Sequence, residues 1–191
     1  MLEPSAKGIG VPGRQHPPPA QPKAHPQPTA GSCACGAARD PPPAINVQGD
    51  DDEACCSGRS QRERETGLLA TNEGYRLPTT SEWTRALGQA QAPDSSNFGP
   101  QLGIDNFPQT SPVGSFPGNS LGLHDLRGNV WEWCTAWPSE EGIGRILRGG
   151  GWRDETPALI AAYRELIVTP KVSAEDYGFR CILVLKRPAG L

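Results

Sequence analysis

The sequence has no aromatic residue before Tyr75, although Trp, Tyr and Phe together number twelve in the chain. The first 44 residues hold 11 of the 21 prolines instead. A segment without large apolar side chains cannot bury enough surface to offset the entropy lost on ordering. The composition therefore predicts that residues 1–44 are a disordered, low-complexity arm rich in Pro, Ala and Gly, and that disorder extends to about residue 60.

Long apolar runs and an excess of positive charge are also lacking. No stretch of about 18 apolar residues exists, and the N-terminus has no apolar core of roughly 7–15 residues such as a secretory signal carries. We therefore expect no signal peptide, no transmembrane segment and no membrane partner for the chain as given, and the compartment is left unknown. Residues 75–191 hold 11 Lys and Arg against 12 Asp and Glu, which argues against a nucleic acid partner because phosphates require a basic surface.

The six cysteines are too unevenly spread to indicate a disulfide framework: Cys33, Cys35, Cys55, Cys56, Cys134 and Cys181. The Cys33-Ala-Cys35 pair, with two histidines nearby, fits no standard zinc spacing. Cys134 and Cys181 are interpreted as small buried apolar residues on core strands, since free cysteine is among the most buried residue types. A disulfide between these two is the alternative.

Local patterns become readable from Gly74 onward. Thr79 and Glu82 form a predicted capping box, and apolar residues at helical spacing follow until Gly88 ends the helix. After a long loop-rich stretch, NVWEWC alternates as a strand with Trp on one face and Glu132 on the other. RILR predicts a short strand, and GFRCILVLK predicts one central strand covered on both faces. A helix followed by loops and strands indicates an α+β domain.

Four blocks of this region resemble one family of enzymes when they are taken together: GYRLPTTSEW (74–83), PVGSFPGNSLGLHDLRGNVWEWC (112–134), RILRGGGW (145–152) and YGFRC (177–181). They occur in the same order in the domain shared by formylglycine-generating enzymes, the sulfatase-modifying factor family. The resemblance implies that residues 74–191 form the C-terminal part of a loop-rich, C-type-lectin-like domain.

A fainter resemblance extends upstream through residues 45–73, which have the length and polar pattern of a helix in that family. Gly49, Cys55, Gly58 and Arg59 stand where the relatives carry Trp, Phe, Trp and Leu. Loss of these side chains removes the apolar face of the helix, and each glycine costs about 1 kcal/mol relative to alanine. We therefore expect a degraded helical segment or a linker here, in a domain truncated on its N-terminal side.

The resemblance implies copper chemistry for the oxidases of the family, in which two cysteines five positions apart bind Cu(I). Thiolates suit this soft ion. The matching positions are Asp154 and Leu159, and no cysteine lies between Cys134 and Cys181. Copper and oxidase activity are therefore not expected. The iron-dependent relatives use three histidines, whereas only His124 occurs in this region.

The resemblance also implies calcium, which prefers about six to eight hard oxygen ligands. Two groups of residues match the family's calcium positions: Asn97, Phe98, Asp105 and Phe107 form the first, and Asp125, Gly128, Val130 and Glu132 form the second. Asp105 and Asp125 could instead cap turns. The inward-facing Glu132 could instead make an internal ion pair with an arginine, the candidates being Arg127, Arg148, Arg153 and Arg164.

Two functions compete at this point. The first is a calcium-stabilised, lectin-like binding or structural module without catalysis, whose loops, especially between Trp152 and Glu175, contact a protein or a glycan. The second is a formylglycine-generating oxidase that activates sulfatases, and a non-functional fragment is a further alternative. The absence of paired thiols between Gly151 and Leu166 favours the first.

Overall fold

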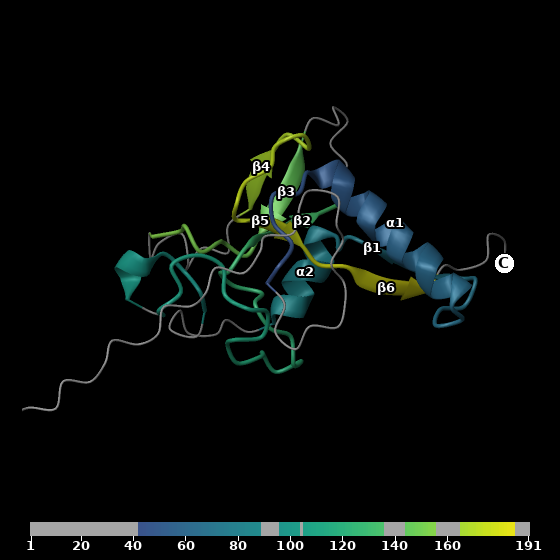
Figure 1. Ribbon diagram of the computed structural model, residues 1–191, viewed down its shortest axis with the longest axis horizontal. Helices are drawn as coiled ribbons and strands as arrows, with labels where there is room; N and C mark the ends of the chain where they lie inside the picture. The colour runs from purple at the N-terminus through teal and green to yellow at the C-terminus, as the bar shows by residue number, and fades with distance from the viewer. Residues whose placement is uncertain (1–41, 89–95, 104, 136–143, 156–164, 186–191) are drawn as a thin grey trace, which may run out of the picture.

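The computed structural model describes residues 42–88, 96–103, 105–135, 144–155 and 165–185 (Figure 1). The expected disorder of residues 1–41 lies outside this part of the chain. The elements follow in the order α1 (Gly49–Glu65), β1 (Glu73–Arg76), α2 (Thr80–Leu87), the 3₁₀ turn η2 (Pro100–Leu102), β2 (Trp131–Cys134), β3 (Arg145–Arg148), β4 (Leu166–Val168), β5 (Tyr177–Phe179) and β6 (Ile182–Leu185). This is the expected α+β composition.

A four-stranded sheet in the order β4-β3-β2-β5 forms the centre of the fold. β2 is antiparallel to β3 and parallel to β5. Trp131 and Trp133 pack in one apolar cluster, whereas Cys134 packs in a second cluster with residues of α2. Successive residues of a strand point to opposite faces, so β2 is covered on both sides and all four of its residues are buried.

The helix α2 begins and ends as the sequence predicts. The Thr79 side chain accepts a hydrogen bond from the Glu82 backbone N–H, and the Glu82 carboxylate accepts one from the Thr79 backbone N–H. Gly88 follows the helix with a φ of 65°, a conformation that glycine adopts without the steric cost of a side chain. Trp83 and Leu87 are buried on the face toward the sheet.

The prediction of one central strand over GFRCILVLK is wrong, because two strands occur there. β5 belongs to the four-stranded sheet, and β6 pairs only with β1 in a separate two-stranded sheet. Leu183 and Leu185 of β6 are 51% and 70% exposed. The apolar run therefore does not indicate a strand covered on both faces.

The prediction of disorder to about residue 60 is also wrong, since the 17-residue helix α1 begins at Gly49. Figure 1 shows α1 lying along the two-stranded sheet. Its buried face consists of Gly49, Asp52, Cys56 and Ser60. The expected loss of an apolar face is thus real, yet the helix still forms and docks.

Polar contacts replace the missing apolar ones in holding α1 against the rest of the fold. Ser60 Oγ accepts a hydrogen bond from the Tyr75 backbone N–H at 2.7 Å, and the Tyr75 hydroxyl donates to the Glu63 carboxylate at 2.8 Å. The Arg145 side chain occupies the space beside Gly49, where a Cβ would lie 2.7 Å from its Cδ. Arg145 also pairs with Glu53 at 3.0 Å. Acidic residues in the first turn and basic residues in the last also favour the helix dipole.

Loops on the other side of the four-stranded sheet from α1 carry most of the candidate ligands (Figure 1). They run through residues 96–130, with η2 as their one short helical turn among the described residues. Within the part of the chain that the structure describes, no helix is long and apolar enough to cross a bilayer.

Candidate functional site

The first group of calcium candidates comes together in space. The Asp105 carboxylate accepts hydrogen bonds from the backbone N–H of Phe98 at 3.2 Å and from that of Phe107 at 2.7 Å. Asn97 is adjacent to Phe98 in the chain and is fully buried. We call Asn97, Phe98, Asp105 and Phe107 the first cluster.

One buried oxygen atom of the first cluster has no hydrogen-bond partner. The Asn97 side-chain N–H donates to the Gln109 carbonyl at 2.9 Å, whereas Asn97 Oδ1 is buried without a hydrogen-bond partner. A buried acceptor without a partner costs about 1–3 kcal/mol. A hard cation would satisfy it, so the donor set of the first cluster fits calcium.

Any cation at this site would depend on backbone oxygens. In the described ranges, no three side chains of His, Cys, Asp or Glu converge closely enough to share a metal ion. The Asp105 carboxylate, the Asn97 amide oxygen and the carbonyls of Phe98 and Phe107 would hold the ion together with water. Asp105 also serves as a turn cap, as the other interpretation of the sequence predicts.

The second group of candidates, Asp125, Gly128, Val130 and Glu132, lies close to the first. Asp125 Oδ2 accepts a hydrogen bond from the Gly114 backbone N–H at 2.7 Å, and burial raises the pKa of this carboxyl. Gly128 has a φ of 71°, and a Cβ there would lie 2.3 Å from the Asn97 carbonyl oxygen. This close approach requires glycine and holds the two groups side by side.

Glu132 makes an internal ion pair, but none of the four expected arginines is its partner. Arg180 Nε donates to Glu132 Oε2 at 2.6 Å, and Arg180 Nη2 donates to Oε1 at 2.6 Å. Trp83 Nε1 donates to Oε2 at 2.7 Å. Glu132 is 4% exposed, and these contacts account for its buried charge without a metal.

Sequence reasoning missed Arg180, although the residue belongs to the YGFRC block. Its approach to Glu132 depends on the parallel pairing of β2 with β5, in which Glu132 lies opposite Gly178. No pattern within a few residues of the sequence predicts such a strand pairing. The available signal was the arginine itself, next to an apolar strand and within a block that resembles the family.

The two positions that match the copper ligands were Asp154 and Leu159, and Leu159 lies outside the described residues. Asp154 Oδ2 accepts a hydrogen bond from the Gly151 backbone N–H at 2.7 Å, and the Asp154 carbonyl accepts one from Gly99 at 3.0 Å. The carboxylate that caps this turn is a hard oxygen group, which Cu(I) does not favour.

Cys134 is a buried residue of the core strand β2, as expected, whereas Cys181 is half-buried and lies just before β6. Cys134 is fully buried, and burial first of all raises the pKa of its thiol to about 12. The thiolate is the reactive form, so burial disfavours reaction at Cys134. Cys181 lies against Cys56, with their Sγ atoms 2.6 Å apart. The alternative of a Cys134–Cys181 disulfide is therefore wrong. His124 contacts the Phe116 carbonyl through Nδ1 at 2.8 Å.

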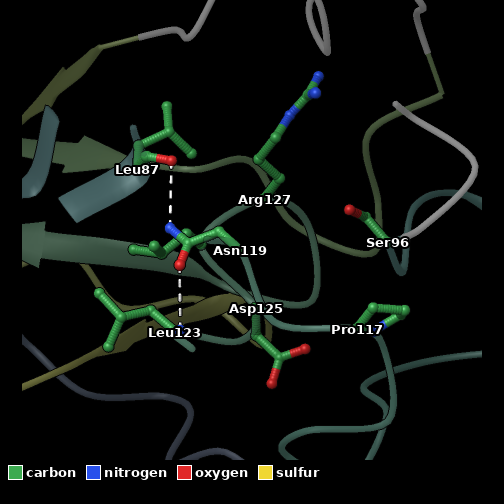
Figure 2. A pocket seen from close by; sticks show the side chains of 8 residues that line it. Leu87, Ser96, Pro117, Asn119, Leu123, Asp125 and Arg127 are labelled. Atoms are coloured by element: carbon green, nitrogen blue, oxygen red, sulfur yellow. Dashed lines mark hydrogen bonds between the residues drawn. The ribbon is translucent and has the colours of Figure 1, made fainter. Parts of the chain in front are cut away.

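Figure 2 shows a pocket beside Asp125, between α2 and the loop that carries Asn119. The Asn119 side chain donates to the Leu87 carbonyl at 3.2 Å and accepts from the Leu123 N–H at 3.1 Å. The pocket has a volume of about 10 Å³. That is room for about one water molecule, far below the roughly 300–1,000 Å³ of ligand pockets.

The arrangement of strands, helices and loops is shared with solved structures. Treponema denticola variable protein 1 aligns with a TM-score of 0.63 at 22% identity, over 85% of this chain and 77% of that chain. PvdO from Pseudomonas aeruginosa aligns with a TM-score of 0.56 at 24% identity, over 76% and 62%. The structure thus confirms the expected α+β class with a C-type-lectin-like fold.

The sequence places the chain in a family. The sulfatase-modifying factor enzyme 1-like domain matches residues 20–185, so the chain belongs to that family, and the match begins well before Gly74 and includes α1. Inactive C-alpha-formylglycine-generating enzyme 2 of Bos taurus is 31% identical over 173 residues, 78% of this chain and 52% of the relative. Formylglycine-generating enzyme of Thermomonospora curvata is 31% identical over 153 residues, 59% of this chain and 50% of the relative. The chain spans about half the length of these relatives.

Proposed function

We propose that this protein is a non-catalytic member of its family, a calcium-stabilised, lectin-like module that binds a partner or serves a structural role. The observation that carries the proposal is the Asp154 carboxylate, which caps a turn where the family's oxidases carry a thiolate. The similarity to a relative named as inactive supports the same conclusion.

The proposed partner is a protein or a glycan that contacts the loops between Trp152 and Glu175. In the described part of this surface, a hollow of about 60 Å³ is lined by Ile45, Gln109, Thr110, Trp152 and Glu175. Trp152 Nε1 donates to the Glu175 carbonyl at 3.4 Å, and the Arg153 guanidinium lies 5.2 Å from the centroid of the Trp152 ring. Partly exposed aromatic residues of this kind often anchor binding surfaces.

We propose the first cluster as the calcium site, because Asn97 Oδ1 lacks a partner while the Glu132 carboxylate of the second group already has two. When bound, calcium would neutralise Asp105 and fasten the loops around residues 96–109. The ion's contribution is structural. No catalytic step depends on it.

Calcium is expected to raise the melting temperature of the protein. Binding to the folded state alone stabilises it by about 2.7 kcal/mol at a hundredfold excess over the dissociation constant, or roughly 5–10 °C. Thermal unfolding with calcium and with a chelator measures the shift. Asp105→Asn should abolish it, whereas Glu65→Gln on the exposed end of α1 should leave it unchanged. Loss of the shift in Asp125→Asn alone would move the site to the second group, and identical melting curves with and without calcium would contradict a calcium site.

The protein is expected not to convert a Cys-x-Pro-x-Arg sulfatase peptide to its formylglycine form when Cu(I) and oxygen are supplied. The physical reason is that a hard carboxylate at Asp154 replaces a soft thiolate. Mass spectrometry of the peptide measures the outcome, because conversion replaces a thiol by an aldehyde. Turnover above a control without protein, and lost with a copper chelator, would favour the oxidase function instead. The double substitution Asp154→Cys with Leu159→Cys tests whether the scaffold can regain Cu(I) binding.

A further inference from the structure

Segments that are distant in the sequence meet at the hollow beside Trp152. It has a volume of about 60 Å³ and is lined by Ile45, Gln109, Thr110, Trp152 and Glu175. None of these residues belongs to a helix or strand of the described fold. A surface assembled from separate loops keeps its shape only if other groups hold the loops together.

Two buried asparagines hold one side of the hollow. Asn129 is 1% exposed, and its side chain accepts a hydrogen bond from the Ser111 N–H at 3.0 Å and donates one to the Ser111 carbonyl at 3.1 Å. The Asn129 carbonyl accepts from the Trp152 N–H at 3.0 Å. The Asn97 side chain donates to the Gln109 carbonyl at 2.9 Å. Asn129 thus links Trp152 to the loop that carries Gln109.

The segments that carry Ile45 and Glu175 are also joined by hydrogen bonds. The Asn46 N–H donates to the Ala174 carbonyl at 3.1 Å, and Trp152 Nε1 donates to the Glu175 carbonyl at 3.4 Å. Ile45 is 6% exposed and forms the apolar part of the lining. Groups that are fixed before a ligand arrives lose less entropy on binding. The hollow is therefore a preformed site.

The side chains around the hollow are of the types that recognise neutral sugars. Among the described residues, neither the Gln109 amide nor the Thr110 hydroxyl has a hydrogen-bond partner. Both can therefore meet the hydroxyl groups of a sugar, which donate as well as accept. Trp152 adds an aromatic ring, on which the apolar face of a pyranose can stack.

Charge and size argue against other ligands. The Arg153 guanidinium lies 5.2 Å from the centroid of the Trp152 ring and 3.8 Å from the Glu175 carboxylate. The ring and the carboxylate thus already have a cation, which disfavours a charged ligand. A volume of about 60 Å³ leaves room for only a few hydroxyl-sized groups. Since no lining residue belongs to a strand, the hollow also has no strand edge to which an extended peptide could add.

We propose that this hollow, which we call the Trp152 site, binds the terminal sugar of a neutral glycan. The sugar ring stacks on Trp152, and its neighbouring hydroxyl groups form hydrogen bonds with Gln109, Thr110 and the Glu175 carboxylate. No lining residue is a calcium candidate, so the sugar contacts the protein and not the ion. The inference rests on the proposed function, whose partner it narrows to a glycan.

Binding is tested with the full chain on an array of neutral glycans that end in mannose, galactose, glucose or N-acetylglucosamine. Sialylated glycans, sulfated glycans and extended peptides form the other arms. We expect retention on a neutral glycan, weakened at least about tenfold by Trp152→Ala and about three- to tenfold by Thr110→Val. Leu121→Ala, which truncates a 63% exposed side chain of another loop, is the matched control and should bind as wild type does.

Retention on no neutral glycan would overturn the proposal, and so would binding that Trp152→Ala leaves unchanged. Retention on peptides alone would assign the site to a protein partner and leave the non-catalytic function intact. Turnover of the sulfatase peptide, by contrast, would contradict the non-catalytic function and not the sugar site. The two failures are therefore distinguishable.

A second measurement locates the sugar without relying on the binding of a variant. The chain has five tryptophans, whose indole N–H resonances are followed by NMR while methyl glycosides of the same four sugars are added to the wild-type protein. The resonance that Trp152→Phe removes identifies Trp152. It should shift on addition of a bound sugar, whereas that of Trp133, which is 0% exposed, should stay in place. A Trp152 resonance that none of the four sugars moves would overturn the proposal.

Discussion

Replacing Arg180 by methionine is expected to lower the free energy of unfolding by about 3–5 kcal/mol, because the substitution leaves the Glu132 carboxylate buried without its cation. Glu132 is 4% exposed and receives two hydrogen bonds of 2.6 Å from the guanidinium. Burial alone would lower the pKa of Arg180, but attraction to Glu132 outweighs it and raises the pKa. The two charges thus stabilise each other, and removing one leaves the other buried without a partner, which lowers the stability of the fold.

An exposed pair of similar geometry is the matched control. Arg76 and Glu82 lie 2.7 Å apart, but their side chains are 40% and 34% exposed. Exposed ion pairs contribute at most about 1 kcal/mol, so Arg76→Met should have a small effect. Urea unfolding followed by tryptophan fluorescence compares the two variants. The double variant Arg180→Met with Glu132→Gln should regain much of the loss, and equal effects of Arg180→Met and Arg76→Met would contradict the buried ion pair.

The sequence predicts those features that depend on neighbours within a few residues. The capping box of Thr79 and Glu82 depends on a spacing of three, and Gly88 ends the helix through its own backbone freedom. The strands around WEWC and RILR follow from alternation and β-propensity. Interactions within one helical turn or one strand can therefore be predicted from the sequence alone.

Features that depend on pairing across the chain could not be predicted in this way. The Glu132–Arg180 contact requires β2 and β5 to be parallel neighbours, and the split at Arg180 and Cys181 sends β6 to a different sheet. Apolar periodicity predicts only a degraded helical segment or a linker at α1, because polar contacts with β1 and Arg145 hold this helix. For the candidate site, the family resemblance supplied the residues, and the structure supplied the partnerless Asn97 oxygen.

The stability of the fold should depend on pH through Asp52, because the folded protein holds this carboxyl group in its neutral form. Burial is the main cause that raises its pKa from the ordinary 3.8 to about 8. The Arg145 guanidinium opposes this shift, whereas the charges of Asp51 and Glu53 on α1 and the Cys181 thiolate, when formed, add to it. Arg145 pairs instead with Glu53 and Asp50, which explains why it does not neutralise Asp52.

The direction of the pH effect follows from proton binding. Between pH 4 and 8 the folded state holds a proton on Asp52 that the unfolded state has released, so the contribution of this group to stability is full below about pH 4 and declines until about pH 8. Each unit of pKa difference corresponds to about 1.4 kcal/mol. The decline should therefore amount to a few kcal/mol in total.

Asp52→Asn keeps the shape of the side chain and removes the ionisation, so it should make the protein more stable than wild type by a few kcal/mol at pH 8. At pH 4 the two proteins should differ by less than about 1 kcal/mol, since the aspartic acid is then neutral. Urea titration across this pH range measures the difference in unfolding free energy between variant and wild type. In this difference the contributions of the other carboxyl groups to the pH dependence cancel. One of these groups is Glu82, whose pKa Arg76 lowers to about 2. Glu65→Gln on the exposed end of α1 is the control and should give a nearly constant difference. A constant difference for Asp52→Asn as well would show that Asp52 ionises normally in the folded protein. Water would then reach a carboxyl that the structure places on the buried face of α1 without a partner.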